Sequence, residues 1–115
     1  MPQGVSRAVI EVLLDRVSQG AATLSPEDRL TYANQRLASM LGVTRVQLIG
    51  KPLLDLATEA DRDMLSSTLT SARETAAQCH IALVRSNGGG PMQALLTFAP
   101  LGHGQLSCIV TREGA

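Results

Sequence analysis

The last third of the chain changes its hydrophobic pattern from helical to alternating, and this change restricts the possible folds most. Residues 79–85, 92–99 and 105–112 each have the pattern of a strand, and glycine-rich turns at 88–90 and 102–104 separate them. Tight turns join antiparallel neighbours, because parallel strands need a long crossover. The sequence therefore predicts an antiparallel meander of three strands.

The first half of the chain adds a strand pair and then helices. Residues 21–25 and 29–33 flank a Pro-Glu-Asp turn and predict a hairpin. Asn34 is a good helix N-cap, and Gly42 stands where a left-handed residue ends a helix. Helices grouped between the two sets of strands predict an α+β fold, with about five antiparallel strands and the helices on one face.

A longer helix is predicted over residues 58–77, after a segment that Gly50 and Pro52 break into short turns. Thr58 and Asp61 have the spacing of a capping box at its start. Its predicted buried stripe consists of Met64, Leu65, Leu69, Ala72 and Ala76.

Residues 1–19 are predicted to form a flanking helix, and residues 20–115 the body of the domain. The helix, beginning near Ser6, is apolar over much of its circumference, so we expect it to contact both its own domain and a second subunit. Packing on one sheet face alone is the alternative. The residues expected in a homodimer contact are Val9, Ile10, Leu13, Leu14 and Val17.

Charge and cysteine content exclude several classes of protein. The formal net charge is zero and no run of like charges occurs, which argues against nucleic-acid binding. No apolar stretch approaches the roughly 20 residues that cross a bilayer, so we expect no membrane contact by this segment. Two cysteines are too few for a disulfide framework, which favours a reducing, cytoplasmic location.

The predicted element order resembles the PAS fold, and the local sequence agrees. Residues 25–65, SPEDRLTYANQRLASMLGVTRVQLIGKPLLDLATEADRDML, look like the PAS core, with Asn34, Gly42, Gly50 and Pro52 in register. The resemblance covers residues 9–111. It implies a sensory domain of a bacterial signalling protein such as a sensor histidine kinase, with a linked kinase or other effector domain in the parent protein.

Two other functions stay open beside this one. They are a ligand-free dimerisation module of a transcriptional regulator or diguanylate cyclase, and a small enzyme on a PAS-like scaffold.

One departure from the family concerns the end of the last strand. Many PAS domains carry an Asp-Ile-Thr-like triplet there, where this chain has Val110, Thr111 and Arg112. The usual coupling to a C-terminal effector is therefore in question.

The residues that known PAS cofactors require are missing from the expected places. Haem-binding PAS domains use a histidine of the long helix, yet residues 59–77 contain none and His80 lies beyond it. Flavin photosensors of the LOV type use a cysteine among the middle helices, and residues 34–77 contain none; the chain also has no tryptophan. Zinc is disfavoured, because Cys79, His80, His103 and Cys108 lack the spacing of a compact zinc site.

No catalytic residues are predicted. The chain has no G-x-S-x-G elbow, P-loop, G-x-G-x-x-G or H-E-x-x-H motif. The resemblance instead implies an aliphatic pocket between helices and sheet, for an unknown small and mostly apolar ligand; a fully packed core is the alternative. The pocket candidates are Leu37, Met40, Leu41, Met64, Leu65, Leu69, Leu83, Leu96 and Phe98.

Overall fold

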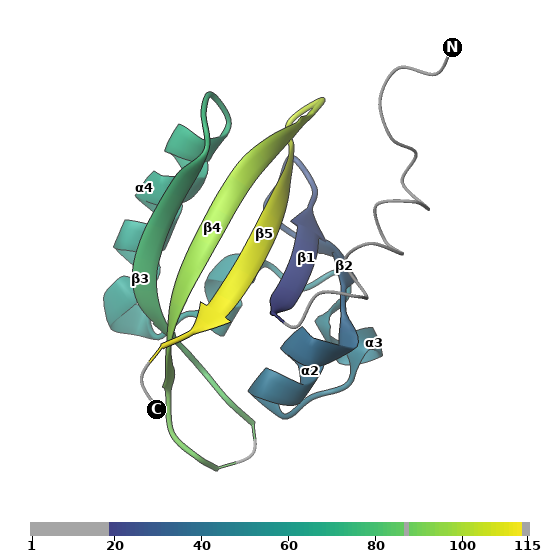
Figure 1. Cartoon of the computed structure of the whole chain (residues 1–115), viewed down its shortest axis with the longest axis vertical. Coiled ribbons are helices and arrows are strands. Elements are labelled where there is room, and N and C mark those ends of the chain that lie inside the picture. The colour runs from purple at the N-terminus through teal and green to yellow at the C-terminus, as the bar shows by residue number, and fades with distance from the viewer. Residues whose placement is uncertain (1–18, 87, 114–115) are drawn as a thin grey trace.

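The computed structural model describes residues 19–86 and 88–113, and within them five antiparallel strands form one sheet in the order β2-β1-β5-β4-β3 (Figure 1). The predicted α+β class and five-stranded antiparallel sheet are confirmed. The elements in chain order are β1 (Gly20–Leu24), β2 (Leu30–Ala33), α2 (Gln35–Leu41), α3 (Arg45–Leu48), the 3-10 turns η1 (Leu53–Leu56) and η2 (Glu59–Asp61), α4 (Arg62–Ala72), β3 (Ala77–Leu83), β4 (Met92–Gly102) and β5 (Gln105–Arg112).

The predicted C-terminal meander is present, with the middle strand longer than expected. Strand β4 pairs with β3 and with β5, and its pairing with β5 closes at Gly102 and Gln105. The two residues between them, His103 and Gly104, have φ values of 55° and 78°. Two successive left-handed residues match the twist of the flanking strands, so a two-residue turn is sufficient here.

The helices cover one face of the sheet, as predicted. In β4 and β5, the residues that alternate toward this face are buried, whereas their neighbours are partly or fully exposed. Phe98 of β4, one of the two aromatic residues, is fully buried on this face. Helices α2, α3 and α4 contribute residues to the same apolar cluster, namely Leu37, Ala38, Leu41, Leu48, Leu65, Leu69 and Ala72.

The segment between α3 and α4 crosses this face and covers both edges of the sheet. At the β2 edge, Leu30 N donates to Lys51 O at 2.9 Å. At the β3 edge, Thr58 N donates to Ala82 O at 3.0 Å. Pairing at these edges satisfies backbone groups that another chain would otherwise bind. The interrupted sequence around Gly50 and Pro52 therefore has a structural role.

The long helix differs from its prediction. Helix α4 ends at Ala72 and residues 59–61 form a 3-10 turn, so the predicted range of 58–77 is wrong at both ends. Met64, predicted to be buried, is 53% exposed, and Ala76 is exposed as well. The buried positions Leu65, Leu69 and Ala72 follow helical spacing, and Met64 lies about 100° around the helix from Leu65.

The predicted capping box at Thr58 and Asp61 is also wrong. The Asp61 carboxylate instead accepts a hydrogen bond from Ala82 N of β3 at 2.8 Å, with the Thr58 hydroxyl at 3.3 Å from the same oxygen. Asp61 therefore ties the start of α4 to the edge strand. A capping box forms at α3, between Thr44 and Gln47.

The predicted flanking helix with Val9, Ile10, Leu13, Leu14 and Val17 lies outside the described residues, apart from Gln19. The division of the chain at residue 19 stays a prediction. Among the described helices, none is long and apolar enough to cross a bilayer.

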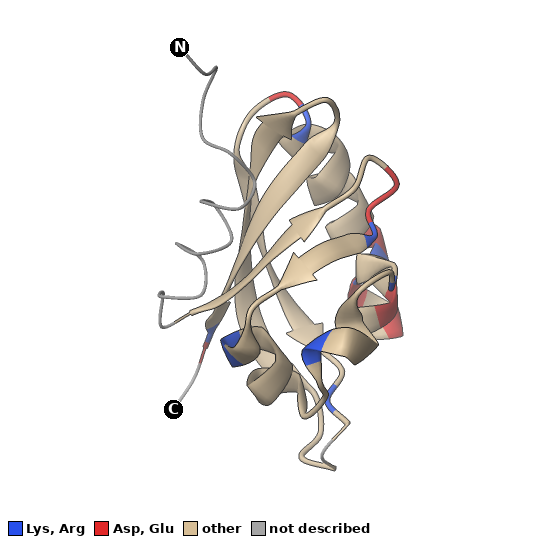
Figure 2. Ribbon diagram, turned by 90° about the vertical axis from the view of Figure 1, so that its right-hand side faces the viewer, with Lys and Arg blue, Asp and Glu red and all other residues tan. Residues whose placement is uncertain are grey.

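Charged residues lie mainly on the helices and turns, and both signs occur (Figure 2). Of the five described strands, only β5 carries a Lys, Arg, Asp or Glu, which is Arg112 at its last position.

Candidate functional site

Asn34 joins the start of β1 to the start of α2. Its side-chain oxygen accepts hydrogen bonds from Leu37 N at 2.9 Å and Ala21 N at 3.0 Å, and its amide nitrogen donates to Gln19 O at 3.0 Å. The residue is 1% exposed. The predicted N-cap of α2 is confirmed, but the contacts with β1 were missed because they span residues that are distant in sequence.

Gly20 lets α2 approach the sheet closely. A Cβ atom at Gly20 would lie 3.2 Å from Leu37 Cδ1, Met40 Sδ and Val110 Cβ. This separation is tighter than ordinary van der Waals contact, so α2 packs directly against the backbone of β1, and Val110 of β5 lies beside the same glycine. The start of β1 is therefore in close contact with both α2 and β5.

The start of β1 and the end of β5 lie together because the two strands pair antiparallel. Gly20 is opposite Val110, and the Gln19 amide donates to the Thr111 hydroxyl at 2.8 Å. The N-terminal flank thus enters the sheet where the C-terminal flank leaves it. We call this place, formed by residues 19–21, α2 and residues 110–112, the flank junction.

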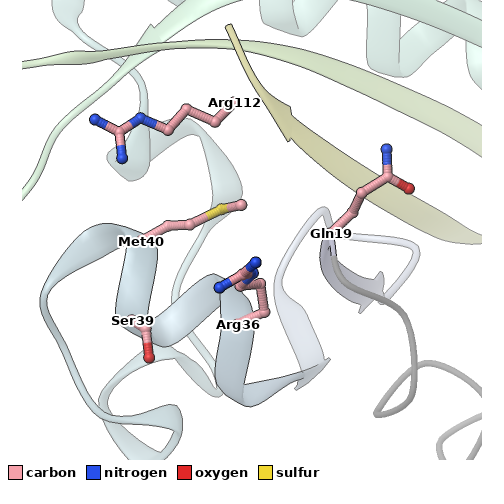
Figure 3. Close-up of a pocket in the computed structure, with 5 residues that line it drawn as sticks. All are labelled: Gln19, Arg36, Ser39, Met40 and Arg112. Carbon is pink, nitrogen blue, oxygen red and sulfur yellow. The ribbon is translucent and has the colours of Figure 1, made fainter. Parts of the chain in front are cut away.

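A pocket of about 410 Å³ opens at the flank junction. Figure 3 shows the side chains of α2 and of the two strand ends arranged around it. Its volume is in the range of small-molecule sites. The lining residues are Gln19, Arg36, Ser39, Met40 and Arg112.

The lining combines positive charge, neutral polar groups and one apolar side chain, and within residues 19–86 and 88–113 it contains no carboxylate. Arg36, Ser39 and Met40 share one face of α2 because they are three and four residues apart. Arg112 follows the buried Val110 by two residues, so its side chain lies on the same, helix-covered side of β5.

The neighbouring acidic residue, Glu113, is engaged elsewhere. Its carboxylate lies 2.8 Å from His80 Nδ1 of β3, and its backbone N donates to Gln93 O at 2.9 Å. His80 has the opposite parity from the buried Cys79, which places this pair on the outer face of the sheet. Glu113 therefore does not neutralise the pocket from within.

The structure distributes the predicted pocket residues over three environments. Met40 lines the pocket at the flank junction, and Met64 is exposed. The others lie in the apolar core beneath the helices, each at most 1% exposed; they are Leu37, Leu41, Leu65, Leu69, Leu83, Leu96 and Phe98. That this core admits a ligand stays a prediction.

Four of the five pocket residues were missed by sequence reasoning, namely Gln19, Arg36, Ser39 and Arg112. Two signals were present. Arg36 and Met40 have the spacing of helix neighbours, and Arg112 places a charge in a strand that otherwise has none. Neither signal indicates that α2 and the end of β5 meet, because this depends on the pairing of β1 with β5.

Both cysteines are free and buried, and β4 separates the strands that carry them. Burial raises the pKa of Cys108 far above its ordinary value, with a small further increase from Cys79. Burial also raises the pKa of Cys79, which a hydrogen bond with Thr68 partly offsets, and Asp61 adds to the increase. Neither thiol is therefore activated as a nucleophile.

The remaining candidate ligands for metals do not converge within residues 19–86 and 88–113. Cys79 and His80 alternate between the two faces of β3, and His103 lies in the β4–β5 turn. No three side chains of His, Cys, Asp or Glu gather there in a way that could hold a metal ion.

Comparison with known proteins agrees with this architecture. Residues 14–112 match the PAS fold family. No curated protein matches the chain in sequence.

Three solved structures illustrate the likeness. The PAS domain of an HTR-like protein from Haloarcula marismortui is 14% identical, with a TM-score of 0.76, and the match covers 92% of this chain and 90% of that one. A domain of a sensory box sensor histidine kinase/response regulator from Geobacter sulfurreducens is 16% identical, with a TM-score of 0.78 and coverages of 90% and 91%. A LOV protein from Rhodobacter sphaeroides is 20% identical, with a TM-score of 0.79 and coverages of 91% and 65%. At these identities the likeness shows the fold alone.

Proposed function

Since this chain belongs to the PAS fold family, whose members are generally sensory modules, we propose that it is the regulatory domain of a cytoplasmic signalling protein. A sensor histidine kinase is the first candidate parent, because the chain is similar in structure to a domain of such a protein from Geobacter sulfurreducens. In this proposal the domain has no catalysis of its own. It associates as a homodimer and biases an effector that follows β5.

The flank junction is the observation that carries this proposal. Antiparallel pairing of β1 and β5 places both flanks at one end of the sheet, and Asn34 connects that end to α2. A change in α2 or in the N-terminal flank therefore reaches the C-terminal exit over a few contacts. A ligand or partner that favours one arrangement of these contacts shifts the effector by its differential affinity.

The outer face of the sheet supports association between copies of the chain. Among its described strand positions it carries no Lys, Arg, Asp or Glu. Leu95 and Ile109 are only partly buried there. Apart from the Glu113–His80 pair at the β3 edge, the strands present little charge to desolvate when this face is covered. The apolar residues at positions 9–17, which the sequence predicts to form a helix stripe, are the second contact in this proposal.

Hydrogen exchange tests the coupling. Asn34→Ala removes the contacts with Gln19 and Ala21, so we expect faster amide exchange at the start of β1 and also at residues 110–112 of β5. Thr44→Ala is the matched control, because it removes the N-cap of α3 without touching β1. Faster exchange confined to α2 in the Asn34 variant would refute the coupling.

Sedimentation velocity and native mass spectrometry test the dimer. We expect a dimer for the unmodified chain and a monomer for Leu13→Glu, because a buried unpaired charge opposes association. Ser18→Glu adds the same charge at a polar position and should remain dimeric. A monomeric wild-type chain, or a dimer that tolerates Leu13→Glu, would contradict the proposed contact.

Native mass spectrometry of the protein as purified from cells also tests the predicted ligand in the core. Additional non-covalent mass that is lost on denaturation would support a small apolar ligand. Chains without additional mass would favour a fully packed core, and the domain would then act through dimerisation alone.

A further inference from the structure

We propose that the pocket at the flank junction binds a small organic acid, with its carboxylate between Arg36 and Arg112 and its apolar part on Met40. The site lies outside the apolar core in which the family resemblance places a ligand. Its effect on an effector rests on the proposed role of the flank junction, whereas binding itself does not.

Charge is the first argument. Arg112 is the only Lys, Arg, Asp or Glu in the described strands, and it extends from the helix-covered side of β5 toward α2. Arg36 approaches the same space from α2, and none of the described lining residues is acidic. Within the described part of the chain, no group accepts a hydrogen bond from Arg112. Two guanidinium groups that line one pocket favour an anion there.

Hydrogen-bonding capacity is the second argument. A guanidinium has five N–H donors, so Arg36 retains donors for a ligand whatever else it contacts. Guanidinium groups bind carboxylates through paired, charge-assisted hydrogen bonds. The Ser39 hydroxyl and the Gln19 amide add neutral donors around the same space. The Gln19 amide is already oriented by its hydrogen bond with Thr111 at 2.8 Å.

The apolar side chain of Met40 and the negative end of the α2 dipole favour a carboxylate over a phosphate. Met40 is partly buried, and its flexible thioether packs against varied apolar groups. Ser39 and Met40 belong to the C-terminal half of α2, where the helix dipole is negative. That end opposes a doubly charged phosphate more than a single carboxylate.

Occupancy would connect α2 to the C-terminal exit. A carboxylate that contacts both arginines adds a direct link between α2 and the last residue of β5. Met40 also rests against Gly20, where an added Cβ would lie 3.2 Å from its sulfur. The ligand would therefore contact α2 and β5 directly and β1 through Met40. It favours the arrangement in which these three elements are closest.

NMR titration of the purified chain tests binding, with acetate, hexanoate and phosphate as probes at constant ionic strength. We expect saturable shifts at Gln19, Ser39 and the arginine side chains of the pocket. Hexanoate should bind about tenfold more tightly than acetate, because its methylene groups are partly buried on Met40. Phosphate should bind more weakly than hexanoate.

Variants locate the site. Arg36→Gln and Arg112→Gln should each weaken hexanoate binding about tenfold, since each removes charge-assisted hydrogen bonds. Arg45→Gln removes the same charge from α3, outside the pocket, and should bind like the wild type. Gly20→Ala should displace Met40 and reduce the preference for hexanoate over acetate.

Three results would overturn the proposal. They are shifts that do not saturate, equal shifts at all arginines including Arg45, and tighter binding of phosphate than of hexanoate. Because this titration needs neither a dimer nor an effector, its failure would leave the proposed regulatory function standing. Failure of the exchange experiment with Asn34→Ala would leave the binding site standing.

Discussion

The two ends of the helical layer use their charged residues differently. At the C-terminal end of α4, the Arg73 guanidinium lies 2.6 Å from Asp28 Oδ1 and donates to Ser25 O at 3.2 Å and Pro26 O at 3.1 Å. Asp28 Oδ1 is buried and accepts no hydrogen bond of good geometry, so the nearby guanidinium charge compensates it. At the flank junction, the neutral Asn34 makes the hydrogen bonds that join β1 to α2, and Arg36 and Arg112 line a pocket.

This difference shows which charges are structural. Arg73 and Asp61 both direct their charge to backbone groups of another element, where they close the fold. Arg112 makes no such contact within the described residues. A charge at the end of a strand, in a pocket whose described lining has no carboxylate, is available to a ligand. Matched variants at the two ends test this distinction.

The largest effect is expected in the core that both ends share. Leu65→Ala in α4 and Leu37→Ala in α2 should each lower the free energy of unfolding by about 3 kcal/mol, because both side chains are fully buried. Met64→Ala is the control and should cost less than about 1 kcal/mol. Urea denaturation measures all three. Equal losses at Met64 and Leu65 would contradict the buried stripe.

The pH dependence of stability tests the two buried cysteines, Cys79 beside α4 and Cys108 beside β1. Burial raises the pKa of both thiols, so at high pH the unfolded chain releases thiol protons that the folded chain retains. Stability is therefore unaffected below the ordinary thiol pKa and falls as the pH rises above it. Between about pH 8 and 10 we expect a loss of about 2 kcal/mol for a fully buried thiol.

Denaturation at several pH values checks this expectation in the wild type and in Cys108→Ala. The variant should be less stable at neutral pH, yet its stability should fall less steeply with rising pH. An unchanged slope would show that Cys108 ionises as readily in the folded chain as in the unfolded one.

A smaller effect separates the two arginine environments directly. Arg73→Gln should lower the free energy of unfolding by about 1 kcal/mol, because it leaves Asp28 Oδ1 buried without a compensating charge. Arg112→Gln should change it by less than about 0.5 kcal/mol, because the residue is exposed. Thermal and urea denaturation of the two variants provide the measurement. A loss at Arg112 as large as that at Arg73 would assign it a structural role.

Features that depend on neighbouring residues were predictable from the sequence. Asn34 caps α2 and Gly42 ends it with a φ of 71°, since both roles depend on backbone geometry within one helical turn. The alternation of buried and exposed residues in β4 and β5 follows from the period of a strand. The prediction that Met64 is buried was wrong because the buried stripe of α4 is narrow. Leu65 lies within this stripe, and the adjacent Met64 already faces solvent.

Features that join distant residues were decided only by the tertiary structure. Asp61 has the local spacing of a cap, yet it binds Ala82, because strand β3 presents an unpaired backbone N–H beside it. The pocket unites Gln19, three residues of α2 and Arg112, which no local pattern relates. Local sequence determined the strands, the turns and the bounds of α2, but not the ends of α4. The pairing of β1 with β5 determined its candidate site, because non-local hydrogen bonds bring the two flanks together.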